Sequence, residues 1–154
     1  MAISTSIRKD STQNQILQFS VYADNKVGRL NDLIGALTHA NLHILAMTVL
    51  DTTDSSIIRL IADYHEDARQ ILKDNKFTFN EVEMVAVEVN MLSDIHKVTC
   101  ALVQAEVNLH YIYPFLARPS GSTAFAMRLE DSDIATAVLQ SCGIRILSRS
   151  DLAR

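Results

Sequence analysis

The residues best suited to binding chemistry lie in one stretch, which we call the first turn: Asp24, Asn25, Lys26, Val27, Gly28, Arg29, Leu30 and Asn31. It lies between a strand-like run and a helical run. Backbone amides converge at the start of a helix, where the helix dipole adds positive charge, so the amides of residues 27–30 suit a carboxylate. Gly28 lets a ligand approach the backbone, and Asp24 or carbonyls near Asn25 suit an ammonium group. The alternative is a plain structural turn.

Two periodic segments must position the first turn. In residues 16–22 the apolar side chains alternate, which is typical of a half-buried strand. In residues 30–40 they recur at helical spacing, which predicts an amphipathic helix with one buried face. Gly35 lies inside this helix, where glycine costs stability relative to alanine, and close packing against a neighbour is the expected reason.

The rest of the first half completes a known order of elements. Strands are predicted at residues 42–50, 57–64 and 77–79, and a helix at 65–75. The order β-α-β-β-α-β is the ferredoxin-like, or split βαβ, pattern.

The second half repeats this pattern at a fixed offset. Apolar residues at 30, 33, 37, 40, 42 and 44 return 65 residues later at 95, 98, 102, 105, 107 and 109. Six matches at one offset indicate a duplicated unit. The similarity of residues 41–43 to 108–110 needs an offset of 67 and is treated as coincidence. Strands are predicted at 82–89, 108–115, 124–129 and 144–147, and a final helix at 131–141, capped by Asp131 or Ser132.

The predicted fold class is α+β: two tandem ferredoxin-like units with antiparallel sheets and helices on one face, joined side by side into an eight-stranded sheet. Residues 1–15 are expected to be a polar extension, 16–80 the first domain and 81–154 the second. A tight turn near Asn80 and Glu81 is expected to separate the domains.

Composition excludes several classes of protein. The chain is 48% hydrophobic and 21% charged, as expected for a folded protein with an adequate core. Its net charge of −4 and lack of a basic stripe argue against a nucleic-acid partner. Its apolar runs are too short to span a bilayer and residues 1–15 do not resemble a signal peptide, so no membrane association and a cytoplasmic location are expected.

These features together resemble the ACT domain. That family often has asparagine, one residue, proline and glycine at the strand-to-helix turn; here Asn25 and Gly28 match, and Val27 replaces the proline. After the helix the family often has alanine, glycine, an apolar residue, asparagine and isoleucine, which the segments 40–44 and 105–109 resemble. The resemblance covers residues 16–152 and is to tandem ACT proteins that stand alone or attach to amino-acid-linked enzymes.

The resemblance implies a regulatory protein that binds a small molecule, most often an amino acid, and acts by an allosteric or assembly change. In the family, ligand lies between the turn of one unit and the strand after the helix of another. Carried over here, the first turn would face Asn108, Leu109 and His110. A weaker, reciprocal site would combine Asn90, Met91, Leu92, Ser93 and Asp94 with Leu42, His43 and Ile44.

The second turn, Asn90–Ile95, is expected to bind poorly. Ser93 replaces Gly28 and Asp94 replaces Arg29 at the offset of 65. Ser93 is expected to be the helix N-cap, so its hydroxyl would occupy the amides that a carboxylate needs, and Asp94 would repel an anion. This loss, with the missing proline, favours an alternative function: an interaction module that docks on a partner enzyme and binds no ligand.

Other constellations predict little. His96 and Cys100 have the i, i+4 spacing of a metal pair, but no further ligands cluster with them, so a surface location is the better interpretation. No catalytic constellation can be assembled, so no enzyme activity, metal or cofactor is predicted. Edge strands of such units usually need cover, which favours a homodimer, and an amino-acid metabolic enzyme is a possible partner implied by the resemblance.

Overall fold

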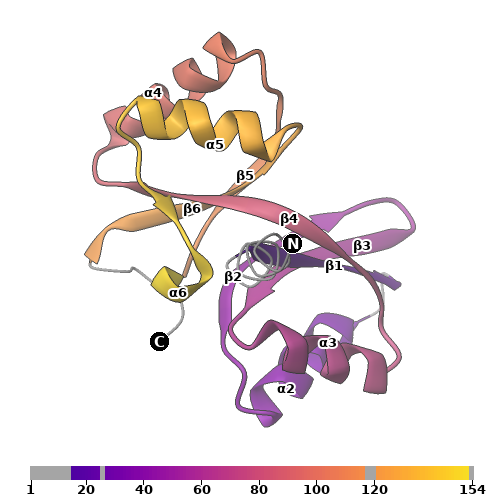
Figure 1. Ribbon diagram of the computed structural model, residues 1–154. Helices are drawn as coiled ribbons and strands as arrows, with labels where there is room; N and C mark the ends of the chain where they lie inside the picture. The colour runs from indigo at the N-terminus through magenta and orange to yellow at the C-terminus, as the bar shows by residue number, and fades with distance from the viewer. Residues whose placement is uncertain (1–14, 25–26, 117–120, 153–154) are drawn as a thin grey trace, which may run out of the picture. The chain divides into compact units, whose positions relative to one another are not determined.

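The computed structural model describes residues 15–24, 27–116 and 121–152, without the side chain of Leu92. Its helices and strands follow the predicted order (Figure 1). They are β1 (Ile16–Asp24), α2 (Arg29–His39), β2 (Ile44–Asp51), β3 (Ser55–Ala62), α3 (His65–Asp74), β4 (Thr78–Val89), α4 (Leu92–Gln104), β5 (Leu109–Pro114), β6 (Thr123–Leu129), α5 (Ser132–Ser141), β7 (Ile146–Leu147) and α6 (Arg149–Leu152).

The chain divides into two compact units. The N-terminal unit comprises Leu17–Val82 and Tyr113–Ala117, and the C-terminal unit comprises Glu83–Ile112, Arg118–Arg154 and Met1–Ile16. Strands β4 and β5 therefore each contribute to both units. Each unit is described by itself below.

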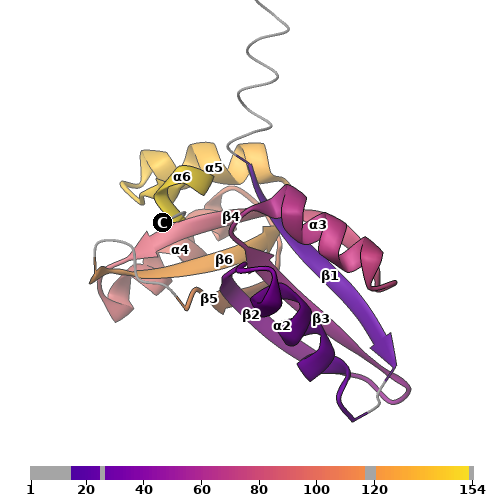
Figure 2. The same ribbon diagram turned by 90° about the horizontal axis from the view of Figure 1, so that it is seen from below.

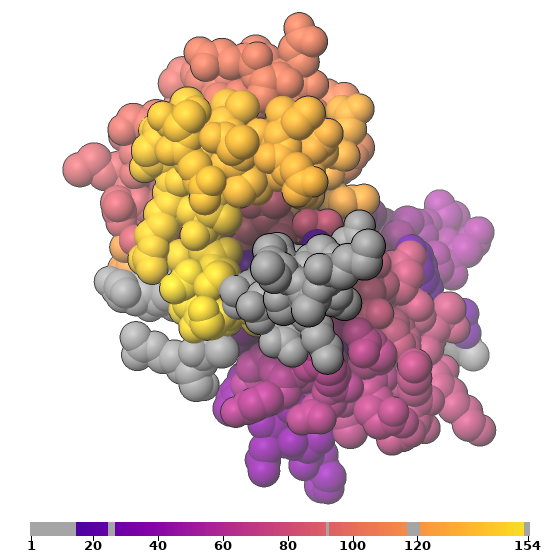
Figure 3. All heavy atoms as spheres, viewed as in Figure 1, coloured from indigo at the N-terminus to yellow at the C-terminus, as the bar shows by residue number. Residues whose placement is uncertain are grey.

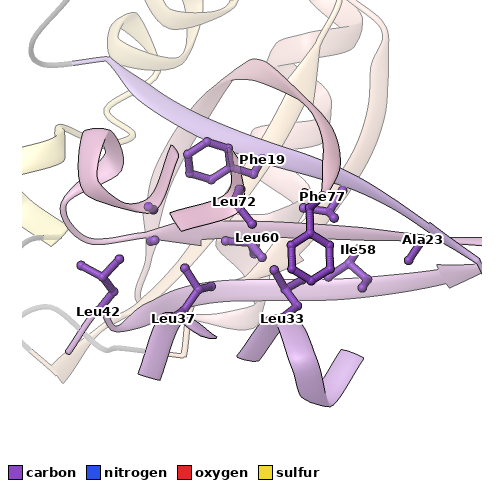
Figure 4. Close-up of a cluster of buried hydrophobic side chains, with 12 residues drawn as sticks. Phe19, Ala23, Leu33, Leu37, Leu42, Ile58, Leu60, Leu72 and Phe77 are labelled. Atoms are coloured by element: carbon purple, nitrogen blue, oxygen red, sulfur yellow. The ribbon is translucent and has the colours of Figure 1, made fainter. Parts of the chain in front are cut away.

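In the N-terminal unit, the strand order is β2-β3-β1-β4. Strand β1 is antiparallel to β3, with Phe19 opposite Leu60 and Asp24 opposite Ser55. Alternate residues of β1 point into a core closed by α2 and α3, which cover one face of the sheet (Figures 2 and 4). The fully buried core side chains include Phe19, Leu33, Leu37, Leu60 and Leu72. The predicted amphipathic helix is confirmed, with Leu33 and Leu37 on its buried face, whereas Leu30 and Ala40, predicted on the same face, are exposed.

The C-terminal unit repeats this plan. Strand β4 is flanked by β6 and β7, both antiparallel to it, and β5 lies beside β6. Helices α4 and α5 contribute Leu102, Ala135 and Leu139 to the core, which lies against Val87 and Met127. The outer face of α5 and the short helix α6, orange to yellow in Figure 3, are at the surface. Helix α6 was not predicted.

The expected turn near Asn80 and Glu81 is wrong, because β4 runs through it without interruption. Two predicted strands, 77–79 and 82–89, are one, so the described residues form seven strands instead of eight. This segment contains no glycine or proline to reverse the chain. The Glu81 carboxylate is tied to α3 by His65 Nε2 at 2.5 Å and by Arg69 Nε at 2.7 Å.

The segment Tyr113–Ala117 completes the N-terminal unit. The Tyr113 hydroxyl donates to Gln18 Oε1 at 2.5 Å, and Gln18 Nε2 donates to Ser20 Oγ at 2.9 Å. Gln18 is fully buried, so this network satisfies an amide on the sheet face away from the helices. The Leu116 amide donates to the Leu45 carbonyl at 2.7 Å, which covers the start of the outer edge of β2.

All four long helices end in the same way, with a residue of positive φ. These residues are Asn41, Lys76, Glu106 and Gly143. After α2 the Leu42 amide donates to the Leu37 carbonyl, and after α4 the Val107 amide donates to the Leu102 carbonyl, both at 3.0 Å. These Schellman-type ends satisfy the last helical carbonyls. The two bonds are related by the offset of 65, which supports the repeat register read from the apolar residues.

Gly35 lies at an open position. Its expected packing against a neighbour is wrong, because a β-carbon built there meets no atom within 4 Å. The cost of a glycine in the middle of α2 therefore has no compensation inside the unit.

Candidate ligand site at the first turn

The first turn connects β1 to α2 through Gly28, whose backbone conformation other residue types do not adopt easily. Gly28 is the N-cap of α2 with φ +95°, in the left-handed region, and its carbonyl accepts from the Asp32 amide at 2.8 Å. Gly28 has no side chain with which to cap α2, so among the described residues the N-cap makes no side-chain hydrogen bond to the helix. Amides in the first helical turn have no intrahelical partner, so they remain available to an anion. Asn25 and Lys26 lie outside the described residues.

Side chains leave the start of α2 accessible. Val27 is fully exposed and Leu30 is 37% exposed. The Arg29 guanidinium lies over the Phe77 ring, 4.5 Å from its centroid, and 3.8 Å from the Asp32 carboxylate. The site therefore combines free helix amides with one cation held at its side.

The second turn has a different geometry. The expected N-cap, Ser93, is wrong: α4 begins at Leu92, and Met91 is the N-cap. Instead, the Asp94 carboxylate accepts from the amides of Met91 at 3.0 Å and Asn90 at 3.1 Å. The Met91 amide, followed by the Asn90 amide and Lys97, holds the pKa of Asp94 below its ordinary value. The second turn thus carries its own bound carboxylate.

Helices α2 and α4 end at the same place in the repeat but begin at different places. Helices α2 and α4 end at His39 and Gln104, which are 65 residues apart, whereas their first residues, Arg29 and Leu92, are 63 apart. Helix α4 therefore begins two residues early in the repeat register, and the residue in the Gly28 position is already helical.

The post-helix segments contain a matched pair of contacts that sequence reasoning missed. The His43 amide donates to Asp63 Oδ1 at 2.8 Å and the Asp63 amide donates to the His43 carbonyl at 3.0 Å. In the C-terminal unit, Asn108 and Glu130 make the corresponding two bonds, at 3.3 and 3.0 Å. An acidic residue directly after each hairpin was the available signal.

His43 adds an interaction that Asn108 lacks. Its Nδ1 lies 2.8 Å from Asp63 Oδ2, while 75% of its side chain is exposed. A carboxylate on one ring nitrogen favours the proton there and leaves Nε2 as an acceptor toward solvent.

The other predicted contacts lie in varied environments. Leu42 is a core residue, so its side chain does not face a ligand. Ile44 and Leu109 are half-buried and His110 is exposed. The predicted combinations of the first turn with residues 108–110, and of the second turn with residues 42–44, join different units and stay predictions.

Metal and membrane signals are weak. Cys100 Sγ lies 3.5 Å from His96 Nε2 on the exposed side of α4. Within the described residues, no group of three or more His, Cys, Asp or Glu side chains is placed to hold a metal ion. None of the helices there has the length and apolar character needed to cross a membrane.

Comparisons with known proteins place this geometry in a family. A family model described as an ACT domain pair matches residues 14–154. The crystal structure of a protein from Bacteroides thetaiotaomicron is 26% identical, with 91% of this chain and 96% of that chain covered and a TM-score of 0.83. No curated protein sequence gives a match.

Two further structures show a shared fold. The regulatory subunit of aspartate kinase from Thermus thermophilus, in ligand-free form, is 11% identical, with 85% of this chain and 91% of that chain covered and a TM-score of 0.59. The regulatory subunit of aspartate kinase from Thermus flavus is also 11% identical, with 85% and 92% covered and a TM-score of 0.58.

Proposed function

We propose that this chain, which belongs to the ACT domain pair family, is a regulatory protein that binds a small carboxylate ligand, an α-amino acid, at the first turn. Membership of that family supports a small-molecule-binding, regulatory role and no catalysis. The ligand carboxylate would bind the amides of residues 27–30, and its ammonium group would bind near Asp24.

One observation carries this proposal. The second turn holds a carboxylate, that of Asp94, on the amides of Asn90 and Met91. At the offset of 65 the first turn has Arg29 in place of Asp94, and its N-cap residue, Gly28, has no side chain to cap the helix. The second turn therefore shows that backbone amides at this turn of the fold can hold a carboxylate, which supports an external carboxylate on the amides of residues 27–30 in the first turn.

Regulation would follow from linkage. A ligand that contacts the first turn and residues 108–110 together favours the arrangement of the units that allows both contacts. The output we propose is a change in assembly, such as a homodimer, or in contact with an amino-acid metabolic enzyme. The aspartate kinase regulatory subunits among the similar structures support an amino-acid context.

The second candidate is an interaction module that docks on a partner enzyme without a ligand. The exposure of Val27 and Leu30 favours it, since apolar side chains at a protruding turn suit a protein contact.

A thermal-shift screen against the twenty amino acids tests the first candidate. A ligand that binds only the folded state raises the free energy of unfolding, by about 2.7 kcal/mol at a hundredfold excess over Kd. The melting temperature rises accordingly. A melting temperature that no amino acid changes would reject the amino-acid proposal and favour the interaction module.

Gly28→Asp locates the site. The new carboxylate occupies the anion position and repels the ligand carboxylate. The ligand-induced rise in melting temperature should therefore disappear while the fold remains. Gly28→Asn has the same backbone strain without the charge and should retain part of the shift. Gly143→Asp, at φ +80° after α5, is the control for strain alone. A full shift in Gly28→Asp would place the ligand elsewhere.

A further inference from the structure

A groove on the N-terminal unit is lined by residues of α2 and of α3 with the segment that follows it. Figures 1 and 2 show these two helices as neighbours on one face of the sheet. Its volume is about 580 Å³, within the range of small-molecule sites. The α2 side contributes Arg29, Asp32, Gly35, Ala36, His39 and Ala40, and Ile71, Asn75 and Phe77 form the other side. All of these residues belong to one unit, so the groove does not depend on how the units are placed.

Gly35 is the feature that needs an explanation. It lies in the interior of α2, where glycine is about 1 kcal/mol less favourable than alanine. Nothing in the unit comes within 4 Å of a β-carbon placed there. The residue therefore provides space in the groove, and nothing within the unit fills that space.

The charged side chains at the mouth of the groove have opposite signs. The Arg29 guanidinium and the Asp32 carboxylate are 3.8 Å apart, and their side chains are 35% and 61% exposed. An exposed pair at this distance contributes little to stability, so a ligand can displace it at small cost. Phe77 holds the guanidinium from one side.

We propose that this groove is a second small-molecule site that takes an α-amino acid with an apolar side chain. The ligand carboxylate binds Arg29, its ammonium group binds Asp32, and its side chain lies over Gly35 and Ala36 toward Ile71. The site shares Arg29 with the first turn, but it uses the guanidinium and not the backbone amides, and it needs no residue of the C-terminal unit.

The corresponding face of the C-terminal unit lacks these features. Asp94, Lys97 and Cys100 take the places of Arg29, Asp32 and Gly35 at the offset of 65. Asp94 is already held by two backbone amides and lies 3.3 Å from Lys97. Cys100 puts a side chain where Gly35 has none, which makes it the matched control position.

The test is a titration of the ¹⁵N-labelled full chain with L-leucine and L-phenylalanine, followed by amide chemical shifts, with L-aspartate as the comparison lacking an apolar side chain. We expect saturable shifts at Gly35, Ala36 and Ile71 with the two apolar amino acids. Gly35→Leu should fill the groove and weaken binding about tenfold or more, while the melting temperature stays the same or rises because a helix glycine is removed.

Arg29→Gln should weaken binding by a similar factor, and Cys100→Leu should leave it unchanged. Gly35→Leu should leave any shifts of the amides of residues 27 and 28 unchanged, because Gly35 lies outside the first turn, and this separates the groove proposal from the one at the first turn. The groove site is rejected if neither apolar amino acid changes the amide chemical shifts of α2 and α3. It is also rejected if Gly35→Leu binds as tightly as wild type, or if Cys100→Leu weakens binding as much as Gly35→Leu does. Shifts abolished by Gly28→Asp alone would support the first-turn site and reject the groove.

Discussion

The first and second turns occupy the same place in two copies of one fold, but their helices begin differently: at a glycine without a side chain in the first, and beside a carboxylate bound to backbone amides in the second. Arg29 follows Gly28 in the first, whereas Asp94 binds back to the amides of Asn90 and Met91 in the second. The earlier start of α4 makes this closure possible. One charge reversal and two extra helical residues therefore distinguish the second turn, which binds its own carboxylate, from the first.

The largest expected effect tests whether the two units have equivalent cores. Leu37 and Leu102 are matched at the offset of 65 and are 0% and 3% exposed. Leu37→Ala and Leu102→Ala should each lower the free energy of unfolding by about 2 to 5 kcal/mol, because each leaves a cavity. Urea unfolding followed by circular dichroism measures both. A loss below about 1 kcal/mol at either site would show that the two cores do not contribute equally to the free energy of unfolding.

A smaller effect is expected from the cluster around Glu81. Burial alone would raise the pKa of Glu81, but hydrogen bonds from Arg69 and His65 outweigh it and lower the pKa. Glu81 therefore adds stability above its unfolded pKa of about 4.3, and this stability is lost as pH falls through the folded pKa. Glu81→Gln should lose about 1 to 2 kcal/mol at neutral pH. The difference from wild type should vanish in acid; a difference independent of pH would contradict the assignment.

Asp94→Asn directly tests the closure of the second turn. The pKa of Asp94 is lowered by the Met91 amide, so its contribution is present above an unfolded pKa of about 3.9 and is lost as pH falls through the folded value. The variant should melt below wild type at neutral pH and match it in acid. Asp133→Asn, in the first turn of α5, removes the same charge as a control. Equal effects of the two variants would mean that only helix-terminal charge matters.

The smallest effect compares the ends of α2 and α4. Asn41 and Glu106 have φ of 58° and 55° and are 65 residues apart. Glu106→Gly should stabilise the protein by about 0.5 to 1 kcal/mol, because only glycine adopts this conformation without strain. Asn41→Gly should change little, because asparagine tolerates it. Thermal unfolding of the two variants measures this difference, and a larger gain at Asn41 would reverse the expected order.

Much of the fold was predictable because it depends on periodicity. The apolar repeat of α2 and α4 gave the duplication, and ACT family membership is confirmed by the match over residues 14–154. The continuity of β4 was missed because Asn80 and Glu81 are polar, and their contacts with Tyr22, His65 and Arg69 come from distant parts of the sequence.

The candidate site was less predictable. The charge reversal between Arg29 and Asp94 was visible in the sequence, and the expectation that the second turn binds an anion poorly stays a prediction. The capping residue differed from the predicted one. The Asp94 carboxylate, and not the Ser93 hydroxyl, accepts hydrogen bonds from the backbone amides at the start of α4. The contact of His43 with Asp63 spans 20 residues, so spacing could not reveal it.

The contacts of Tyr113 and Leu116 with the N-terminal unit have a consequence for how this protein can be dissected. A polypeptide cut after Val82 would contain the whole first repeat as the sequence defines it, but not the Tyr113 hydroxyl that serves the buried Gln18 amide. It would also expose the Leu45 carbonyl at the edge of β2, where an unpaired strand invites association with another chain. The repeat in the sequence and the compact unit in the structure therefore have different bounds, because the unit also includes Tyr113–Ala117 from the second half.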